Sequence, residues 1–279
     1  MTVQKSDQFA LVAEAFTRQS SNYDQYEEGN HILKWMRQQV RNHALEFLKL
    51  GDKILELNSG TGIDAEFFAE KGFTIHCTDL TSGMINQMQN KFSQKKLSDK
   101  ITVQQCSFTE LNKIGDKKFD FIFSNFGGLN CIPDLNEVTK FFPSLLNNKG
   151  KVCLVIMPPV CPWEIVQCVR GKFKFAFRRL NKNGMLANIE GIIFTTFYFT
   201  PGDVMKALGK NFKLQKLEGL AVFTPNPQMT NFSKKFPGLT RLLNKMDEKI
   251  SGIFLFNRIG DHIIVTAEYS LKKTPHSIL

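Results

Sequence analysis

Short apolar runs alternate with amphipathic stretches along the chain from residue 50 onward. Two of the stretches, residues 64–70 and 82–92, have the periodicity of helices. Five of the runs have the length and apolar content of buried strands: residues 53–57, 74–78, 101–103, 119–124 and 151–157. Because strands that alternate with helices are joined by crossover connections, the pattern predicts a doubly wound, parallel sheet.

Two further strands and a helix are predicted in the second half of the chain. The strands are expected at residues 212–220 and 260–269, and the helix at 201–208. Residues 1–50 have a helical pattern and precede the first strand. The prediction is therefore an α/β fold with a mostly parallel, seven-stranded Rossmann-like sheet and a helical cap from the N-terminus.

Residues 158–199 and 224–258 interrupt the alternation of strands and helices. The first segment opens with a proline cluster, and the second contains an amphipathic stretch at 232–250. Both segments connect late strands of the sheet. We therefore expect them to be insertions that cap the carboxyl edge of the sheet, where open α/β sheets bind their ligands.

The first insertion is aromatic as well as basic. If residues 163–180 are helical, one stripe of the helix holds Trp163, Val166, Phe173, Phe177 and Leu180. We expect Trp163 and some of the three phenylalanines, which include Phe175, on the inner side of the cap. The arginine and lysine side chains are expected to point outward or to the mouth of the cap.

A glycine-rich turn follows the first predicted strand, in the segment Glu56-Leu-Asn-Ser-Gly-Thr-Gly62. Glycine at a strand-to-helix turn lets the backbone approach a ligand closely and adopt positive φ. Asp79 ends the second predicted strand, 17 residues after Gly62, where a carboxylate can accept the hydroxyl hydrogens of a ribose. The two features together predict a nucleoside-bearing cofactor across the first two strand ends.

This segment resembles the class I S-adenosylmethionine-dependent methyltransferases, whose pattern is E/D-x-G-x-G-x-G. Glu56, Gly60 and Gly62 match that pattern, and Asn58 stands in place of its first glycine. Asparagine is the residue other than glycine that best tolerates the left-handed region, so positive φ is predicted at Asn58. The resemblance implies that Glu56 and the Gly60–Gly62 backbone approach the methionine part of S-adenosylmethionine and that Asp79 holds the ribose.

The resemblance covers residues 45–157 well and the C-terminal strands loosely. It implies that Leu80 and Met84 lie against the adenine. Ser107 or Cys106 occupies the place of an aspartate that touches the adenine amino group, beside Phe108. Residues 119–128, which include Asn125, correspond to a strand and loop that line the methyl-transfer site.

The N-terminal segment 16–26 is similar to the opening of small-molecule members, including quinone-biosynthesis methyltransferases, in which a tyrosine closes over the cofactor. The resemblance assigns this part to Tyr23. A sulfonium is already an activated electrophile, so the reaction needs alignment of the acceptor and exclusion of water, and a base only if the acceptor arrives protonated. His31, His262 and Tyr23 are the candidate bases, but the sequence names none of them, so the catalytic residue stays open.

The charge is unevenly distributed. Residues 1–150 hold 17 Lys and Arg against 18 Asp and Glu, a net charge of −1, whereas residues 151–279 hold 19 against 8, a net charge of +11. Six basic residues and no acidic ones lie between Glu164 and Glu190. This half could face an acidic substrate, an anionic membrane surface or a nucleic acid, or the charge could serve solubility.

The composition fits a folded protein, because 42% of the 279 residues are hydrophobic and 22% are charged. No apolar run reaches the roughly 18 residues of a membrane span, and no apolar signal core follows Met1. The six cysteines contain no C-x-x-C pair, so neither a disulfide framework nor a metal site is favoured, and we expect a cytoplasmic protein.

Four functions remain open. The favoured one is methyl transfer to a small apolar, aromatic or acidic molecule, since the chain has 26 phenylalanines to build an apolar pocket. An RNA methyltransferase would use the basic half, but the loop Ser124-Asn-Phe-Gly differs from the N-P-P-Y type of base-methylating enzymes. A nicotinamide-dependent oxidoreductase and a non-catalytic binder are less favoured.

The expected organisation is one structural domain. Residues 1–157 would supply the cap helices and the cofactor-binding half, and residues 158–279 the remaining strands and the substrate cap. Substrate identity, methyl acceptor atom and oligomeric state are not indicated by the sequence.

Overall fold

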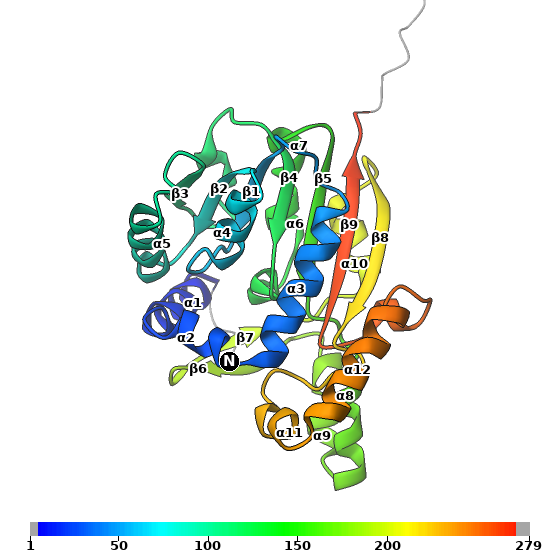
Figure 1. Ribbon diagram of the computed structural model, residues 1–279. Coiled ribbons are helices and arrows are strands. Elements are labelled where there is room, and N and C mark those ends of the chain that lie inside the picture. The colour runs from blue at the N-terminus through cyan, green and yellow to red at the C-terminus, as the bar shows by residue number, and fades with distance from the viewer. Residues whose placement is uncertain (1–4, 272–279) are drawn as a thin grey trace, which may run out of the picture.

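The computed structural model describes residues 5–271 and contains a seven-stranded sheet in the order β3-β2-β1-β4-β5-β9-β8 (Figure 1). The strands are β1 (Lys53–Leu57), β2 (Thr74–Asp79), β3 (Ile101–Gln105), β4 (Phe119–Ser124), β5 (Leu146–Ile156), β8 (Phe212–Leu220) and β9 (His262–Tyr269). Strands β1 to β5 pair in parallel, and β9 pairs antiparallel with both β5 and β8. The predicted α/β fold with a mostly parallel, seven-stranded sheet is confirmed.

Helices cover both faces of this sheet. One face packs against α3 (His31–Leu45), α4 (Ile63–Glu70) and α5 (Ser82–Gln94). The other face packs against α6 (Asn136–Thr139), α7 (Phe142–Leu145) and α10 (Pro201–Leu208). The central strands β1, β2 and β4 are buried on both sides, which explains why they appear in the sequence as continuous apolar runs.

The carboxyl edge of the parallel strands is covered by the N-terminal helices and a hairpin. Helix α1 (Lys5–Gln19) and helix α2 (Tyr23–Glu28) form the predicted N-terminal cap. The hairpin of β6 (Met185–Ile189) and β7 (Ile192–Thr196) packs against α1, where Phe194 lies 6.2 Å from Phe16 between ring centroids. The later part of the 158–199 insertion thus reaches the cap that the sequence predicts.

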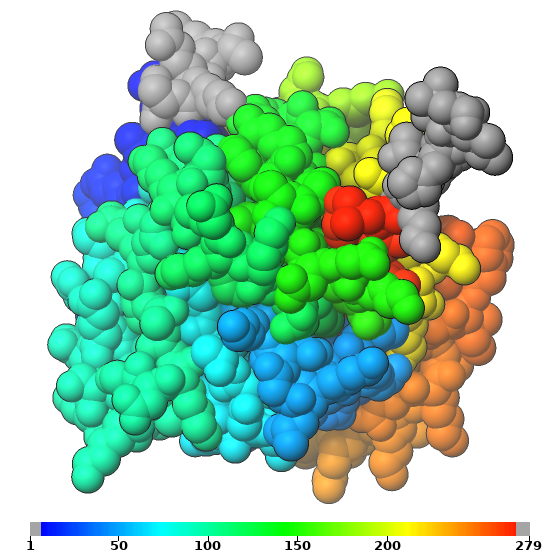
Figure 2. Space-filling model, turned by 90° about the horizontal axis from the view of Figure 1, so that it is seen from above, coloured from blue at the N-terminus to red at the C-terminus, as the bar shows by residue number. Residues whose placement is uncertain are grey.

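The remaining helices of the two insertions lie together at one end of the molecule (Figure 1). They are α8 (Pro162–Ile165), α9 (Phe173–Ala176), α11 (Thr230–Lys235) and α12 (Pro237–Ile250). Helix α12 also packs beside α3, where the Trp35 indole donates a hydrogen bond of 3.0 Å to Glu248, and Figure 2 shows these two segments side by side. No helix within residues 5–271 has the length and apolar character needed to cross a membrane.

The predicted helical stripe at 163–180 is wrong. Residues 162–180 form two single-turn helices and two 3₁₀ turns, Val166–Arg170 and Arg178–Leu180, interrupted at Gly171 with φ 70°. The predicted orientation is wrong for the three phenylalanines, since Phe173, Phe175 and Phe177 are exposed, whereas Trp163 is half-buried as predicted and the lysines of this segment point outward. Arg179 turns inward and is buried between Glu164 and Asp261, at 2.9 and 3.0 Å. A buried carboxylate needs a cation, and this requirement outweighs the aromatic periodicity.

A glycine packs the first strand-to-helix turn against α5. Gly62, at the start of α4, has φ 78°, and a Cβ at this position would lie 2.3 Å from the Phe92 ring. Both the backbone conformation and the space therefore require glycine here. Gly171 has a similar left-handed conformation (φ 70°), but nothing lies within 4 Å of its Cβ position.

We predict that Gly62→Ala destabilises the protein more than Gly171→Ala does. Each variant carries the left-handed penalty of about 1 kcal/mol, and only Gly62→Ala adds an overpacking cost of about 1–3 kcal/mol. Urea unfolding of both variants measures the difference. Equal losses would show that α5 yields to the methyl group without cost.

Candidate active site

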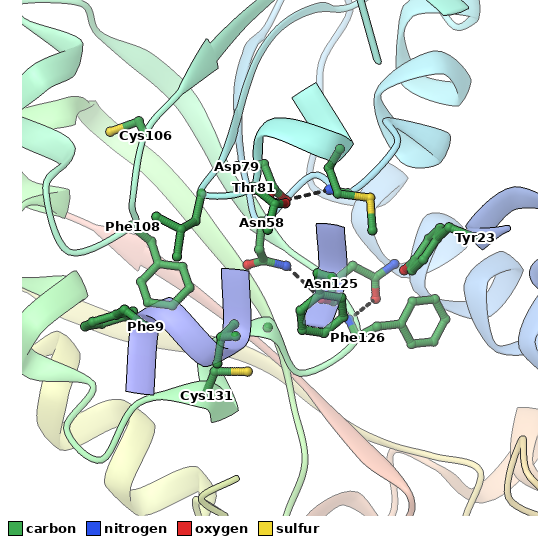
Figure 3. Close-up of a pocket in the computed structure, with 16 residues that line it drawn as sticks. Phe9, Tyr23, Asn58, Asp79, Thr81, Cys106, Phe108, Asn125, Phe126 and Cys131 are labelled. Atoms are coloured by element: carbon green, nitrogen blue, oxygen red, sulfur yellow. Dashed lines mark hydrogen bonds between the residues drawn. The ribbon is translucent and has the colours of Figure 1, made fainter. Parts of the chain in front are cut away.

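A pocket lies between α1 and the carboxyl ends of β1, β2 and β4 (Figure 3). In Figure 3, Phe9 and Phe108 stand on one side of it and Tyr23 on the other. Its lining is largely apolar, with polar groups from the strand ends. The lining residues are Phe9, Val12, Phe16, Tyr23, Asn58, Gly60, Asp79, Leu80, Thr81, Met84, Cys106, Phe108, Asn125, Phe126, Gly128 and Cys131.

Asp79 provides the buried carboxylate of the pocket. One oxygen accepts the backbone N–H of Gly60 at 2.9 Å, and the other accepts the N–H of Thr81 at 2.9 Å and the Thr81 hydroxyl. Burial raises the pKa of Asp79, and the hydrogen bonds from Thr81 and Gly60 oppose that rise. The carboxylate is thereby tied to the glycine turn and faces the pocket.

Asn58 has φ 45°, so the predicted left-handed conformation is confirmed. Its side chain has a second role that the sequence does not show. The Asn58 amide donates to the backbone carbonyl of Asn125 at 3.1 Å and accepts from the Ser124 hydroxyl at 2.7 Å. A Cβ on Gly128 would lie 2.4 Å from Asn58 Cγ. Asn58 therefore ties the first turn to the loop after β4.

Three of the expected site residues lie behind the pocket surface. Glu56 is buried, its carboxylate accepts a hydrogen bond from the Cys77 thiol at 3.9 Å, and burial raises its pKa well above the usual range. Gly62 packs on Phe92 as described above. The Ser107 hydroxyl hydrogen-bonds that of Thr109 at 2.8 Å, and its neighbour Cys106 lines the pocket instead. These residues can support the turn and the strand ends from behind, but they do not line the pocket.

Tyr23 lines the pocket next to a buried ionic cluster. Arg37 of α3 pairs with Glu27 and Asp64, and Asp64 also accepts from Arg41 at 2.8 Å. Burial raises the pKa of Tyr23 to about 12. The phenol is therefore a hydrogen-bond donor at neutral pH, which argues against Tyr23 as a base.

The same cluster holds the loop after β4. The Asn125 amide donates to Asp64 at 2.8 Å, and the Arg37 guanidinium lies 4.6 Å from the centroid of the Phe126 ring. Although burial alone would raise the pKa of Asp64, Arg37 and Arg41 hold it below its ordinary value. The loop residues that line the pocket are thus fixed by paired charges.

The two candidate histidines do not line the pocket. His31 is exposed at the start of α3. His262 is buried at the start of β9, where Asp261 lies 3.0 Å from Nδ1 and the ring meets Phe126 edge-on at 5.7 Å between centroids. His262 therefore contacts a lining residue and is not itself part of the lining.

Sequence reasoning missed the contribution of α1. Phe9, Val12 and Phe16 face the pocket, at intervals of three and four residues. This spacing is visible in the sequence and marks one face of a helix. It could have indicated α1 as a wall of the pocket, whereas the lining by Cys131 depends on the tertiary fold.

The model of one protein family, described as a methyltransferase domain, matches residues 54–150. This segment is a methyltransferase domain. The match makes the protein an enzyme with a methyltransferase domain over residues 54–150, and the sheet order and the pocket agree with that assignment. Comparison with curated proteins gives no significant match.

Solved structures with the same fold include several methyltransferases. One from Listeria monocytogenes, assigned as S-adenosylmethionine-dependent, is 17% identical over 85% of this chain and 99% of its own, with a TM-score of 0.58. One from Galdieria sulphuraria, assigned as a sarcosine dimethylglycine methyltransferase, is 16% identical over 85% and 84%, with a TM-score of 0.53. The geranyl diphosphate C-methyltransferase of Streptomyces coelicolor is 10% identical over 84% and 79%, with a TM-score of 0.53.

The pocket of the methyltransferase fits the nucleoside part of the cofactor. Asp79 receives three hydrogen bonds, so about one of the four acceptor positions of its carboxylate stays free. Gly60, with φ 58°, brings bare backbone to the pocket, and the side chains of Leu80 and Met84 supply apolar surface beside it.

We predict that Asn58→Gly destabilises the methyltransferase although glycine is the usual residue at this position of the family. The variant keeps the backbone conformation but leaves the buried Ser124 hydroxyl without its acceptor, at a cost of about 1–3 kcal/mol. Asn58→Val should lose about 1–2 kcal/mol more, since a side chain branched at Cβ is disfavoured at positive φ. Urea unfolding measures both.

A fully stable Asn58→Gly variant would show that only the backbone conformation matters at Asn58. An Asn58→Val variant no worse than Asn58→Gly would contradict the backbone argument.

Proposed function

We propose that the protein transfers the methyl group of S-adenosylmethionine to a small apolar or aromatic molecule. The observation that carries this proposal is the pocket, in which the polar end at Asp79 continues into a wall built by α1 and the loop after β4. Phe9 and Phe16 of α1 and Phe126 of the loop after β4 make this wall largely aromatic. Such a surface suits an apolar acceptor.

The cofactor-contacting residues are proposed from their place in the pocket and from the family resemblance. Asp79 would accept a ribose hydroxyl, and Leu80, Met84 and Phe108 would lie against the adenine. Tyr23, Asn58, Gly60 and Asn125 would surround the methionine part, with Glu56, Gly62 and Ser107 supporting them from behind. When bound, S-adenosylmethionine supplies an electrophilic methyl group on a sulfonium.

We infer that the protein positions the reactants and excludes water, with no general base among the described residues that line the pocket. Among the lining groups, burial raises the pKa of Tyr23 and Cys131 to about 12 and raises that of Cys106. These groups hold their protons at neutral pH. The lining therefore suits an acceptor that attacks without first losing a proton, such as a neutral amine nitrogen with its lone pair.

The alternative acceptor, a nucleic acid, has less support. The arginines and lysines of residues 170–182 lie on segments that do not line the pocket, and α1 covers the carboxyl edge of the strands. Two neighbours with this fold are described by small-molecule substrates, geranyl diphosphate and sarcosine or dimethylglycine. The family match favours methyl transfer over a nicotinamide-dependent reaction.

Asp79→Asn is the variant that tests the proposed site. Loss of the charged acceptor should weaken binding of S-adenosylhomocysteine roughly tenfold to a hundredfold, the equivalent of about 1.5–3 kcal/mol. Isothermal titration calorimetry measures the change. Asp116→Asn, at an exposed carboxylate before β4, is the matched control and should bind like the unaltered protein.

Methyl-labelled S-adenosylmethionine then tests the acceptor in a cell extract. We expect label in the small-molecule fraction, much reduced with Asp79→Asn and retained with Asp116→Asn. Label confined to the RNA fraction would overturn the choice of acceptor, and unchanged affinity in Asp79→Asn would overturn the site.

A further inference from the structure

Exposed apolar side chains gather on the turns between α8 and β6. Val169 is 88% exposed and Phe173 is 61% exposed, and three further members are exposed by 43–54%. These three are Phe175, Phe177 and Leu180. Single exposed apolar residues need no explanation, but five within 12 residues form a patch that does.

Helix α12 presents a second row of exposed apolar residues. Leu239, Leu242 and Met246 are exposed at intervals of three and four residues, whereas Thr240 and Asp247 face inward and are buried. The Asp247 carboxylate accepts the backbone N–H groups of Phe223 and Thr224. The buried face of α12 is therefore polar, and part of its apolar face points to solvent.

The two patches belong to adjoining elements. The Trp163 ring of α8 meets the Phe232 ring of α11 at 5.5 Å, and Phe232 meets the exposed Phe236 at 5.3 Å. Figure 1 shows α8, α9, α11 and the start of α12 together at one end of the molecule. We call the exposed residues of 166–182 and 234–249 the cap face.

The cap face also carries cations without partners. Seven basic residues of the cap face form no ion pair with a carboxylate of residues 5–271. They are Arg170, Lys172, Lys174, Lys182, Arg241, Lys245 and Lys249. Arg178 and Arg179 differ, since both pair with the buried Glu164. The cations that stabilise the fold are thus separate from those that remain free.

We propose that the cap face binds the surface of anionic phospholipid bilayers. Exposed aromatic and aliphatic side chains can enter the headgroup region, while lysine and arginine beside them meet the negative lipid charge. A second copy of the chain would bring like charges together. A nucleic acid would match the cations but leave the apolar side chains in water. This combination of groups fits a membrane surface best.

The proposal does not depend on the identity of the methyl acceptor. Flotation of the full-length protein with phosphatidylcholine vesicles, with and without phosphatidylglycerol, measures binding. We expect binding only with phosphatidylglycerol, and a decrease as sodium chloride rises from roughly 0.05 to roughly 0.5 M, because salt screens the exposed charges. Equal binding to both vesicles, or to neither, would overturn the proposal.

Lys172→Glu with Lys174→Glu tests the charges. We expect partitioning to fall roughly tenfold or more, since each basic residue near an anionic surface contributes about 1 kcal/mol. The matched control, Lys117→Glu with Lys210→Glu, makes the same charge change at exposed positions before β4 and β8, away from the cap face. An equal loss in this control would show a mere effect of net charge and would overturn the assignment to the cap face.

Val169→Ser with Phe173→Ser tests the apolar contribution and should also weaken partitioning. Leu50→Ser with Leu271→Ser is its control, since these leucines are 85% and 62% exposed beside the opposite edge of the sheet. Urea unfolding and S-adenosylhomocysteine calorimetry should be unchanged in all four variants, which separates loss of the surface from loss of the fold or of the cofactor site. The proposal would be contradicted if the unaltered protein bound no vesicles but bound RNA in a gel-shift assay, and if Lys172→Glu with Lys174→Glu abolished that RNA binding.

Discussion

Arg37 is a buried cation whose charge has to be balanced inside the protein. The carboxylates of Glu27 in α2 and Asp64 in α4 balance this charge, and the Arg37 guanidinium lies over the Phe126 ring of the loop after β4. Removal of one partner from such a cluster leaves a charge in a medium that solvates it poorly, which is why buried ionic groups occur in complete sets. The cluster therefore fixes the positions of α2, α3 and α4 relative to one another.

The pocket is shaped by what this cluster holds. Asp64 anchors the Asn125 side chain, and Asn58 binds the Asn125 carbonyl from the other side. The Gly60 N–H donates a hydrogen bond to Asp79, and this bond joins the glycine turn to the end of β2. Hydrogen bonds, joined through the backbone of the glycine turn, thus link α3 to the proposed ribose-binding carboxylate, so the polar groups are in place before a ligand arrives.

The parts that could be predicted from the sequence are those set by local physics. Continuous apolar runs gave the strands of the doubly wound sheet, and the tolerance of asparagine for positive φ gave the conformation of Asn58. The orientation of Arg179 could not be predicted, because its partner Asp261 lies 82 residues away and becomes a neighbour only in the folded sheet. The Arg37 cluster was missed for the same reason, since its carboxylates come from two other helices.

Replacement of Arg37 by methionine is the most direct measurement of whether the cluster organises the pocket. Urea unfolding should show a loss of about 3–5 kcal/mol, because the buried Glu27 carboxylate loses its cation and Asp64 keeps only Arg41. Arg18→Met, which breaks an exposed pair with Glu14, should cost at most about 1 kcal/mol. Calorimetry should also show weaker binding of S-adenosylhomocysteine to folded Arg37→Met, with Arg18→Met unchanged. Stability and affinity no different from those of Arg18→Met would contradict the account.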